Sequence, residues 1–301
     1  MSNSLTIALV PQGSLHQHWK FVQAGAKKAV AELNSGGANI NLVCKAPMRE
    51  DDRDEQAEIV DRLLRNGVDG LVLAPFDNRF LVERVERAAR DGVPTVVIDS
   101  SLDTSKIVSF VATDNRKAGA LAADRVGKLL DGGGKVLLLR YQKDVGSTEA
   151  REEGFAERIR TYPAIELLRS DQYAGVTRDT AKRAAEALLQ KHSDADAIFT
   201  PNESSTAGTL MALQALKQAG KTILVGFDAS ELYVDTMRNN RIHGLAVQDP
   251  LRMGELGVRT LAEHIAGKPV QKRIDIPAVM VTPENMDKPE IQRLLHLPLA
   301  M

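Results

Sequence analysis

Short runs of β-branched and aliphatic residues recur along this chain, and stretches long enough for helices separate them. The runs lack a polar residue at every second position, so both faces of each expected strand are apolar, as in parallel sheets covered by helices on both sides. The intervening stretches place apolar residues three and four positions apart, the spacing of one helix face. The pattern therefore predicts consecutive β-α-β units. Strands are expected at 6–10, 39–44, 70–73, 95–98 and 107–112, and helices at 19–33, 52–66, 78–91 and 115–130.

The same pattern starts again after the turn Gly132-Gly133-Gly134, which predicts a second, similar α/β lobe. The segment 68–75 resembles 195–201, and each is followed by a helical stretch and then by an apolar strand that ends in aspartate. We therefore expect Asp99 and Asp228 to occupy equivalent positions in the two lobes. No Pro/Gly/Ser-rich linker separates the halves, so several strand crossings are expected to join them. The second set of strands is expected at 135–139, 165–168, 197–200, 223–225 and 244–247.

Composition excludes several classes of protein. The 301 residues, 43% of them hydrophobic, suffice for two domains with ordinary cores. Lys and Arg number 39 against 40 Asp and Glu, so no overall positive charge is available to hold nucleic acid or an anionic membrane. The single cysteine, Cys44, excludes an intramolecular disulfide and is expected to be a buried strand thiol. No apolar stretch reaches the roughly 18 residues that a membrane span needs.

Polar residues follow several of the expected strands. In open parallel sheets, ligands bind at the carboxyl ends of the strands, where loops leave polar groups facing a crevice. Any one of these residues could cap a helix or form a turn, but their recurrence on successive strands indicates a binding site. The candidates are Gln12, Asp99, Thr113, Asn202, Asp228 and Gln248, with Arg151 at a helix start and Tyr173 in a loop.

Other kinds of site are less well supported by the residues. Gly132-Gly133-Gly134-Lys135 is followed by a strand and by Val136, unlike a phosphate-binding loop. His16 and His18 lack a third ligand of metal-binding type, so we expect no metal and no cofactor. Asp99 and Asp228 could form the acid–base pair of a glycosidase, or they could simply hydrogen-bond ligand hydroxyls. We expect no enzyme, because the chain carries neither a nucleophile elbow nor a dinucleotide fingerprint.

From Thr6 to about Val281 the order of motifs resembles the periplasmic sugar-binding proteins of the type I fold, especially the ribose-binding subfamily. The resemblance implies an α/β fold of two Rossmann-like lobes with parallel sheets, joined by a hinge of three crossovers near Thr113, Gln248 and Ile276. One lobe would comprise 1–113 and 249–276, the other 114–248 and 277–301, with the tail after Val281 packed against a lobe. The motifs are Val111-Ala112-Thr113-Asp114-Asn115, Ala150-Arg151-Glu152-Glu153-Gly154-Phe155, Ala197-Ile198-Phe199-Thr200-Pro201-Asn202 and Val225-Gly226-Phe227-Asp228.

The resemblance also implies the roles of the site residues. Charged and amide side chains would hydrogen-bond sugar hydroxyls, and aromatic rings would pack on the sugar faces. In the first loop Gln12, His16 and His18 replace the Ser, Asn and Phe that ribose binders carry, which puts ribose itself in doubt. The polar set is Asp99, Arg151, Asn202, Asp228 and Gln248; the aromatic set is Trp19, Tyr173 and Phe227; Thr113 matches a small-residue position.

Two functions therefore remain open on the sequence. The favoured one is high-affinity binding of a monosaccharide or polyol by hinge closure, with a pentose such as ribose first and a hexose second, for delivery to an ABC transporter permease. Such a protein is expected to be a periplasmic monomer whose signal peptide has been removed. The alternative is the ligand-sensing domain of a LacI-type regulator, although a first strand beginning by Thr6 leaves no room for a helix-turn-helix.

Overall fold

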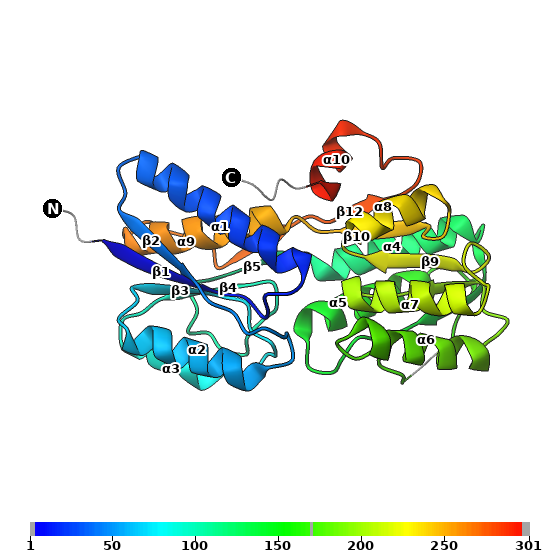
Figure 1. The fold of residues 1–301 in the computed structure, drawn as a ribbon, viewed down its shortest axis with the longest axis horizontal. Coiled ribbons are helices and arrows are strands. Elements are labelled where there is room, and N and C mark those ends of the chain that lie inside the picture. Colours follow the sequence, from blue (N-terminus) through cyan, green and yellow to red (C-terminus); the bar gives the residue numbers. More distant parts are fainter. Residues whose placement is uncertain (1–3, 169–170, 297–301) are drawn as a thin grey trace. The chain divides into compact units, whose positions relative to one another are not determined.

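The computed structural model describes residues 4–168 and 171–296, which form two compact units (Figure 1). The first unit contains the described residues up to Thr113 together with Asp249–Ile276. The second unit contains Asp114–Gln248, apart from residues 169–170, together with Pro277–His296. Within the described residues the chain therefore passes from one unit to the other after Thr113, Gln248 and Ile276. Residues 297–301, which were expected in the second lobe, lie outside the described residues.

The first unit is a parallel sheet with helices on both faces (Figure 1). Side chains that alternate along β1 divide between two cores: Ile7 and Leu9 pack with α1 and α9, whereas Ala8 and Val10 pack with α2 and α3. The strands, in sheet order, are β11 (Arg273–Ile276), β5 (Ser109–Thr113), β4 (Thr95–Ile98), β3 (Gly70–Leu73), β1 (Leu5–Val10) and β2 (Ile40–Cys44). The helices are α1 (Gln17–Ser35), α2 (Arg53–Arg65), α3 (Val82–Arg90) and α9 (Pro250–Ile265).

The second unit repeats this arrangement on its own sheet. One face packs against α4 and α5, where the rings of Phe155 and Phe199 stack, and the other packs against α6, α7, α8 and α10. The strands, in sheet order, are β12 (Val279–Val281), β10 (Gly244–Val247), β9 (Ile223–Phe227), β8 (Ala197–Phe199), β6 (Gly133–Leu138) and β7 (Ala164–Leu168). The helices are α4 (Asn115–Leu129), α5 (Gly146–Ile159), α6 (Arg178–Lys191), α7 (Glu203–Ala215), α8 (Glu231–Arg238) and α10 (Pro289–Leu295).

Glycines let one pair of helices in each unit approach at backbone contact. In the first unit, a β-carbon on Gly25 would overlap the carbonyl oxygen of Leu251, and one on Gly254 would overlap that of Val22. In the second unit, Gly119 and Gly154 meet carbonyl oxygens of the facing helix in the same reciprocal way. The pairs α1–α9 and α4–α5 are thus fixed by four residues that cannot carry a side chain.

The predicted α/β fold of two similar lobes is confirmed, with local differences. The tail after Val281 packs against the second unit, where Ile291 and Leu295 join the core, but β12 runs antiparallel to β10. The helix expected from residue 78 begins only at Val82, because the Asp77 carboxylate accepts hydrogen bonds from the backbone N–H groups of Arg79 and Phe80 and forms a turn. Cys44 is only half-buried, because β2 is an edge strand.

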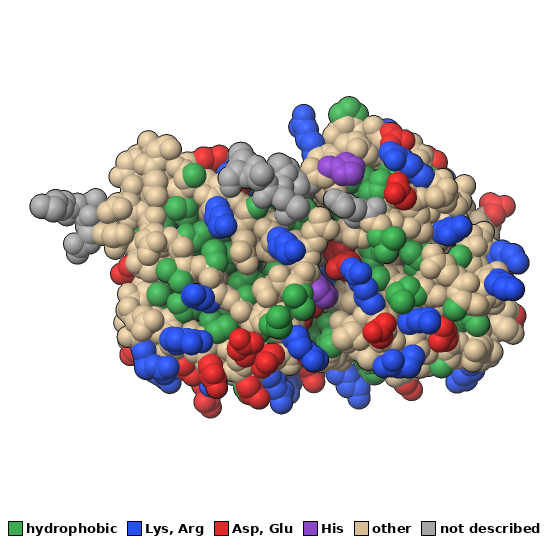
Figure 2. Space-filling model, viewed as in Figure 1, with side chains coloured by type: hydrophobic (Ala, Val, Ile, Leu, Met, Phe, Trp, Pro, Cys, Tyr) green, Lys and Arg blue, Asp and Glu red, His purple; other side chains and the backbone are tan. Residues whose placement is uncertain are grey.

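Charges of both signs are interspersed over the face of the molecule drawn in Figure 2, and no broad basic patch occupies that face. Among the described residues, no helix combines the length and apolar character that a membrane span requires. The described part of the chain also contains no cluster of three or more potential metal ligands. His16 and His18, considered above as possible metal ligands, belong to no such cluster.

Candidate functional site

The two strand-end aspartates occupy equivalent backbone positions in their units. Asp99 follows β4 with a φ of 65°, and Asp228 follows β9 with a φ of 66°. Each donates its backbone N–H to the next strand of its own sheet, Asp99 to Val111 O at 3.1 Å and Asp228 to Ala246 O at 2.9 Å. Aspartate is one of the few residues that adopt this left-handed conformation readily. Both carboxylates therefore emerge from the same sharp turn at the carboxyl edge of a parallel sheet.

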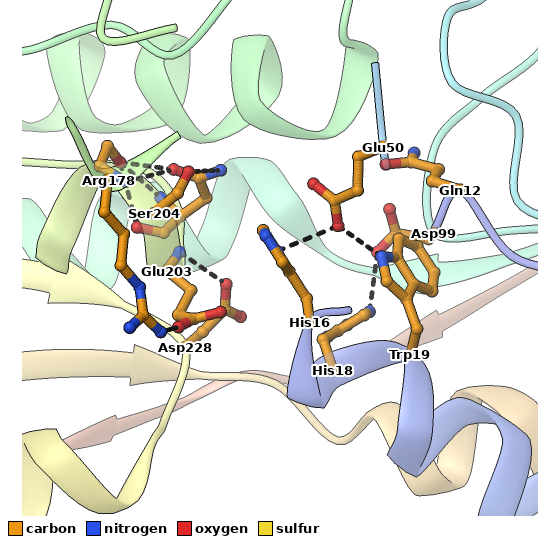
Figure 3. A network of polar contacts seen from close by, with 12 residues as sticks. Gln12, His16, His18, Trp19, Glu50, Asp99, Arg178, Glu203, Ser204 and Asp228 are labelled. Atoms are coloured by element: carbon orange, nitrogen blue, oxygen red, sulfur yellow. Dashed lines mark hydrogen bonds and ion pairs between the residues drawn. The ribbon is translucent and has the colours of Figure 1, made fainter. Parts of the chain in front are cut away.

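In the first unit, Asp99 belongs to a chain of polar contacts (Figure 3). Gln12 Nε2 donates to Ser100 Oγ at 3.3 Å, and Ser100 Oγ donates to Asp99 Oδ2 at 3.4 Å. His18 Nε2 lies 3.4 Å from Asp99 Oδ1. Gln12 also donates to Pro75 O at 2.8 Å, which ties the loop after β1 to the loop after β3. The predicted residues Gln12, His18 and Asp99 thus lie together.

His16 and Trp19 both contact a residue that the sequence analysis did not identify, Glu50. Trp19 Nε1 donates to Glu50 Oε1 at 2.5 Å, and His16 Nδ1 lies 3.1 Å from the same oxygen. The Trp19 side chain is only 3% exposed and packs in the core with Val22 and Met253. Its role as an aromatic wall for a sugar therefore remains a prediction, whereas its N–H is already used to hold a carboxylate.

A second residue missed by the sequence analysis, Gln56, fastens two strand ends in the first unit. Its Nε2 donates to Pro11 O at 3.0 Å and to Ala74 O at 2.8 Å, and its Oε1 accepts from Phe76 N at 3.0 Å. Gln56 is fully buried on α2. A polar residue on the apolar face of that helix was the only sequence signal that could have revealed it.

In the second unit, the Asp228 carboxylate accepts hydrogen bonds from a backbone N–H group and a side-chain amide. Oδ2 accepts the backbone N–H of Glu203 at 3.1 Å, and Oδ1 accepts from Gln248 Nε2 at 2.7 Å. Glu203 is the first residue of α7, so the helix N-terminus faces the carboxylate. Tyr233 donates its hydroxyl to Glu203 O at 2.6 Å, and burial raises the pKa of Tyr233 well above its usual value, so the hydroxyl stays a donor.

Arg151 is a buried cation in the same unit. Its guanidinium lies 3.9 Å above the ring centroid of Phe227, in cation–π contact. Arg151 Nε donates to Asn115 Oδ1 at 2.8 Å, and Nη1 donates to Pro201 O at 2.9 Å. The predicted residues Arg151 and Phe227 therefore lie together. Phe227 is fully buried, and its ring packs against the Arg151 guanidinium.

Asn202 and Tyr173 have clear structural roles of their own. Asn202 caps α7, accepting the backbone N–H of Ser205 at 3.1 Å. The Tyr173 hydroxyl accepts from Arg140 Nη1 at 2.9 Å, and Arg140 Nε donates to Glu152 Oε2 at 2.7 Å. Burial raises the pKa of Glu152, even though Arg140 and a backbone N–H donate to it. Thr113, the remaining predicted residue, is the buried last residue of β5.

Each unit therefore presents carboxylate, amide and nitrogen groups at the carboxyl edge of its own sheet. Carboxylates accept hydrogen bonds from hydroxyl groups, while amides, imidazoles and guanidinium groups donate to hydroxyl oxygens. Such a set can bind a small neutral polyhydroxylated molecule by its edges.

Comparisons with known proteins agree with this geometry. The sequence matches the family described as "Periplasmic binding protein domain" over residues 7–269. Ribose import binding protein RbsB of Bacillus subtilis is 32% identical over 236 residues, covering 77% of this chain and 75% of that protein. Among solved structures, a solute-binding protein from Agrobacterium vitis with bound D-fucose is 29% identical, with a TM-score of 0.89 over 97% of this chain and all of that one. An Agrobacterium radiobacter solute-binding protein in complex with D-arabinose is 28% identical, with a TM-score of 0.89, covering 98% of this chain and 100% of that one.

Proposed function

The chain belongs to the periplasmic binding protein family, and we propose that it is the receptor of an ABC sugar importer, which binds a monosaccharide or a small polyol and releases it unaltered. The proposal rests on one observation above all. Each unit ends its fourth strand in a left-handed aspartate whose carboxylate is already oriented by neighbouring polar groups. The names of the matched proteins, which bind ribose, D-fucose and D-arabinose, support a sugar as the ligand.

The side chains suit the shape of a sugar. A sugar ring carries hydroxyl groups around its edge and C–H groups on its faces, so planar carboxylates, amides and a guanidinium belong at the edge. In the second unit Asp228, Gln248 and Arg151 are held by hydrogen bonds within the protein, which reduces the entropy lost on binding. We propose that these residues and Asn202, with Asp99, Gln12, His16 and His18 of the first unit, bind the hydroxyl groups.

Binding is proposed to proceed by hinge closure. The chain passes between the units after Thr113, Gln248 and Ile276, which provides backbone segments where a hinge rotation can occur. The closed form would then be recognised by a permease in the membrane, and the protein would act as a periplasmic monomer. A pentose is the first choice of ligand and a hexose the second.

A thermal-unfolding screen of ligand-stripped protein tests the proposal. The probes are D-ribose, D-arabinose, D-galactose, D-fucose, xylitol and myo-inositol. A ligand that binds only the folded protein, at a thousand times its Kd, adds about 4 kcal/mol to stability. This corresponds to a rise in Tm of about 8 °C or more. One sugar that raises Tm selectively, and is recovered unhydrolysed after incubation, supports the receptor. If no probe raises Tm, the receptor proposal is contradicted. Hydrolysis of the sugar indicates an enzyme.

A further inference from the structure

Glu50 is turned inward on a loop in which the two preceding residues, Met48 and Arg49, face the solvent. It lies between β2 and α2, where the neighbouring Met48 is 66% exposed and the Arg49 side chain 63% exposed, while the Glu50 side chain is only 13% exposed. Removing a carboxylate from water costs free energy unless hydrogen bonds replace the lost hydration. The inward orientation therefore requires partners.

Those partners all contact one oxygen of the carboxylate. Trp19 Nε1 donates to Oε1, and His16 Nδ1 lies 3.1 Å from that same oxygen. Among the contacts of the described residues, Oε2 receives no hydrogen bond, and it is not one of the enclosed side-chain atoms that lack a partner. Oε2 is thus a fixed acceptor that is open to a hydroxyl group. Figure 3 shows Glu50 in the same cluster as Gln12, His16, His18 and Asp99.

Sheet order explains why a residue so distant in sequence reaches this cluster. β2 pairs with β1 in parallel register, Leu9 opposite Cys44, so the loops that follow the two strands lie side by side. A β-carbon on Gly13 would lie 2.9 Å from Glu50 Cγ, which shows how closely the loops approach.

We propose that Glu50 is a ligand-binding residue that selects for a hydroxyl group at one position of the sugar. This inference rests on the proposed sugar-binding function and extends it to specificity. A site with a fixed acceptor discriminates strongly against an analogue that lacks the hydroxyl, because the acceptor then loses hydration without gaining a partner. Glu50 would thus discriminate between a sugar and one of its deoxy analogues.

Titration calorimetry with deoxy sugars tests the proposal. The probes are D-ribose with its monodeoxy analogues, and D-galactose with D-fucose, its 6-deoxy form. For the parent sugar that binds, we expect one deoxy analogue to bind wild type about 10- to 100-fold more weakly. In Glu50→Ala this difference should fall to less than about threefold, because the acceptor is gone. Asp51→Asn, in the same loop and paired with Arg49 at the surface, should leave every affinity unchanged.

The outcomes separate the two proposals. If wild type binds none of the sugars and polyols of the thermal screen, the sugar-binding function itself fails and this inference with it. If wild type binds but Glu50→Ala weakens parent and deoxy sugars by the same factor, Glu50 only positions Trp19, and the inference is wrong. Unchanged affinities in Glu50→Ala would also overturn it. Glu50→Gln, which keeps an acceptor for Trp19, provides a folded variant if Glu50→Ala has a lowered Tm, and it should reduce the same difference.

Discussion

Asp228 in the second unit accepts hydrogen bonds from a backbone N–H and a glutamine amide, whereas Asp99 in the first unit is faced by a histidine and a serine. The backbone around the two residues is nearly identical, with φ angles of 66° and 65° and the same hydrogen bond to the next strand. The fold thus duplicates the turn that presents the carboxylate, while the side chains that orient it have diverged. Imidazole and hydroxyl groups can reverse their polarity, but the backbone N–H of Glu203 cannot, so the first unit can vary its ligand contacts more freely.

The largest expected effect comes from disrupting the close helix pair that each unit contains. Gly25→Leu in the first unit and Gly119→Leu in the second would each force a side chain into the backbone of the facing helix. We expect each to lower the free energy of unfolding by about 3 kcal/mol or more, as measured by urea denaturation. Ala31→Leu, on the exposed face of α1, is the control and should change it by less than about 0.5 kcal/mol. Equal stabilities for Gly25→Leu and Ala31→Leu would contradict the close contact.

A second difference lies in how the strand ends are fastened. In the first unit Gln56 satisfies three backbone groups, whereas in the second Thr206 accepts from Phe227 N at 3.1 Å and donates to Asn202 O at 2.7 Å. Gln56→Ala leaves three buried groups without their partner and should cost about 2–4 kcal/mol in urea denaturation. Faster hydrogen exchange at the Phe76 amide should accompany the loss. Glu58→Ala, on the exposed face of α2, is the matched control.

Replacing each of the two aspartates with asparagine sharpens the comparison at the site itself. Asparagine tolerates the left-handed turn, so the fold should survive in both variants. In Asp228→Asn the oxygen can still accept from the Glu203 N–H, but the Gln248 amide must rotate to accept from the new NH₂ group, whereas in Asp99→Asn the Ser100 hydroxyl has only to reverse. We expect sugar affinity to fall about 100-fold for Asp228→Asn and about 10-fold for Asp99→Asn by calorimetry. Asp91→Asn, exposed at the end of α3, is the control, and the reverse order of the two losses would refute the argument.

The smallest expected effect is a pH dependence of stability that originates from a histidine in the second unit. Burial, followed by the charge of Arg125, lowers the pKa of His243, whose Nδ1 accepts the backbone N–H of Leu224 at 3.1 Å. Below about pH 6.5 the unfolded chain binds a proton that the folded protein resists, so stability is complete above that pH and declines below it. Urea denaturation between about pH 7.5 and 5.5 should show a decline of up to about 1 kcal/mol that His243→Gln reduces. His264 is exposed in the first unit, and His264→Gln should leave the decline in stability unchanged.

Several features of the fold were predictable because they are encoded locally. Uninterrupted apolar runs identified strands such as Gly70–Leu73, Thr95–Ile98 and Gly244–Val247, since residues buried on both faces must be apolar. The repeated order of a similar segment, a helix and an apolar strand that ends in aspartate indicated that Asp99 and Asp228 are equivalent, and their backbone angles agree. The direction of β12 was not predictable, because three residues carry no signal for parallel or antiparallel pairing.

The sequence by itself determined that the chain alternates strands and helices in two similar units and that polar residues follow the strands, because periodicity and strand ends are properties of neighbouring residues. Only the tertiary structure decided which partners those polar residues meet. Glu50 lies 31 positions from Trp19 and Gln56 lies 45 positions from Pro11, and both contacts form because sheet order places the segments after β1 and β2, each a loop with the start of a helix, side by side. Such contacts depend on which strands are neighbours, and the amino-acid pattern within either loop does not record that.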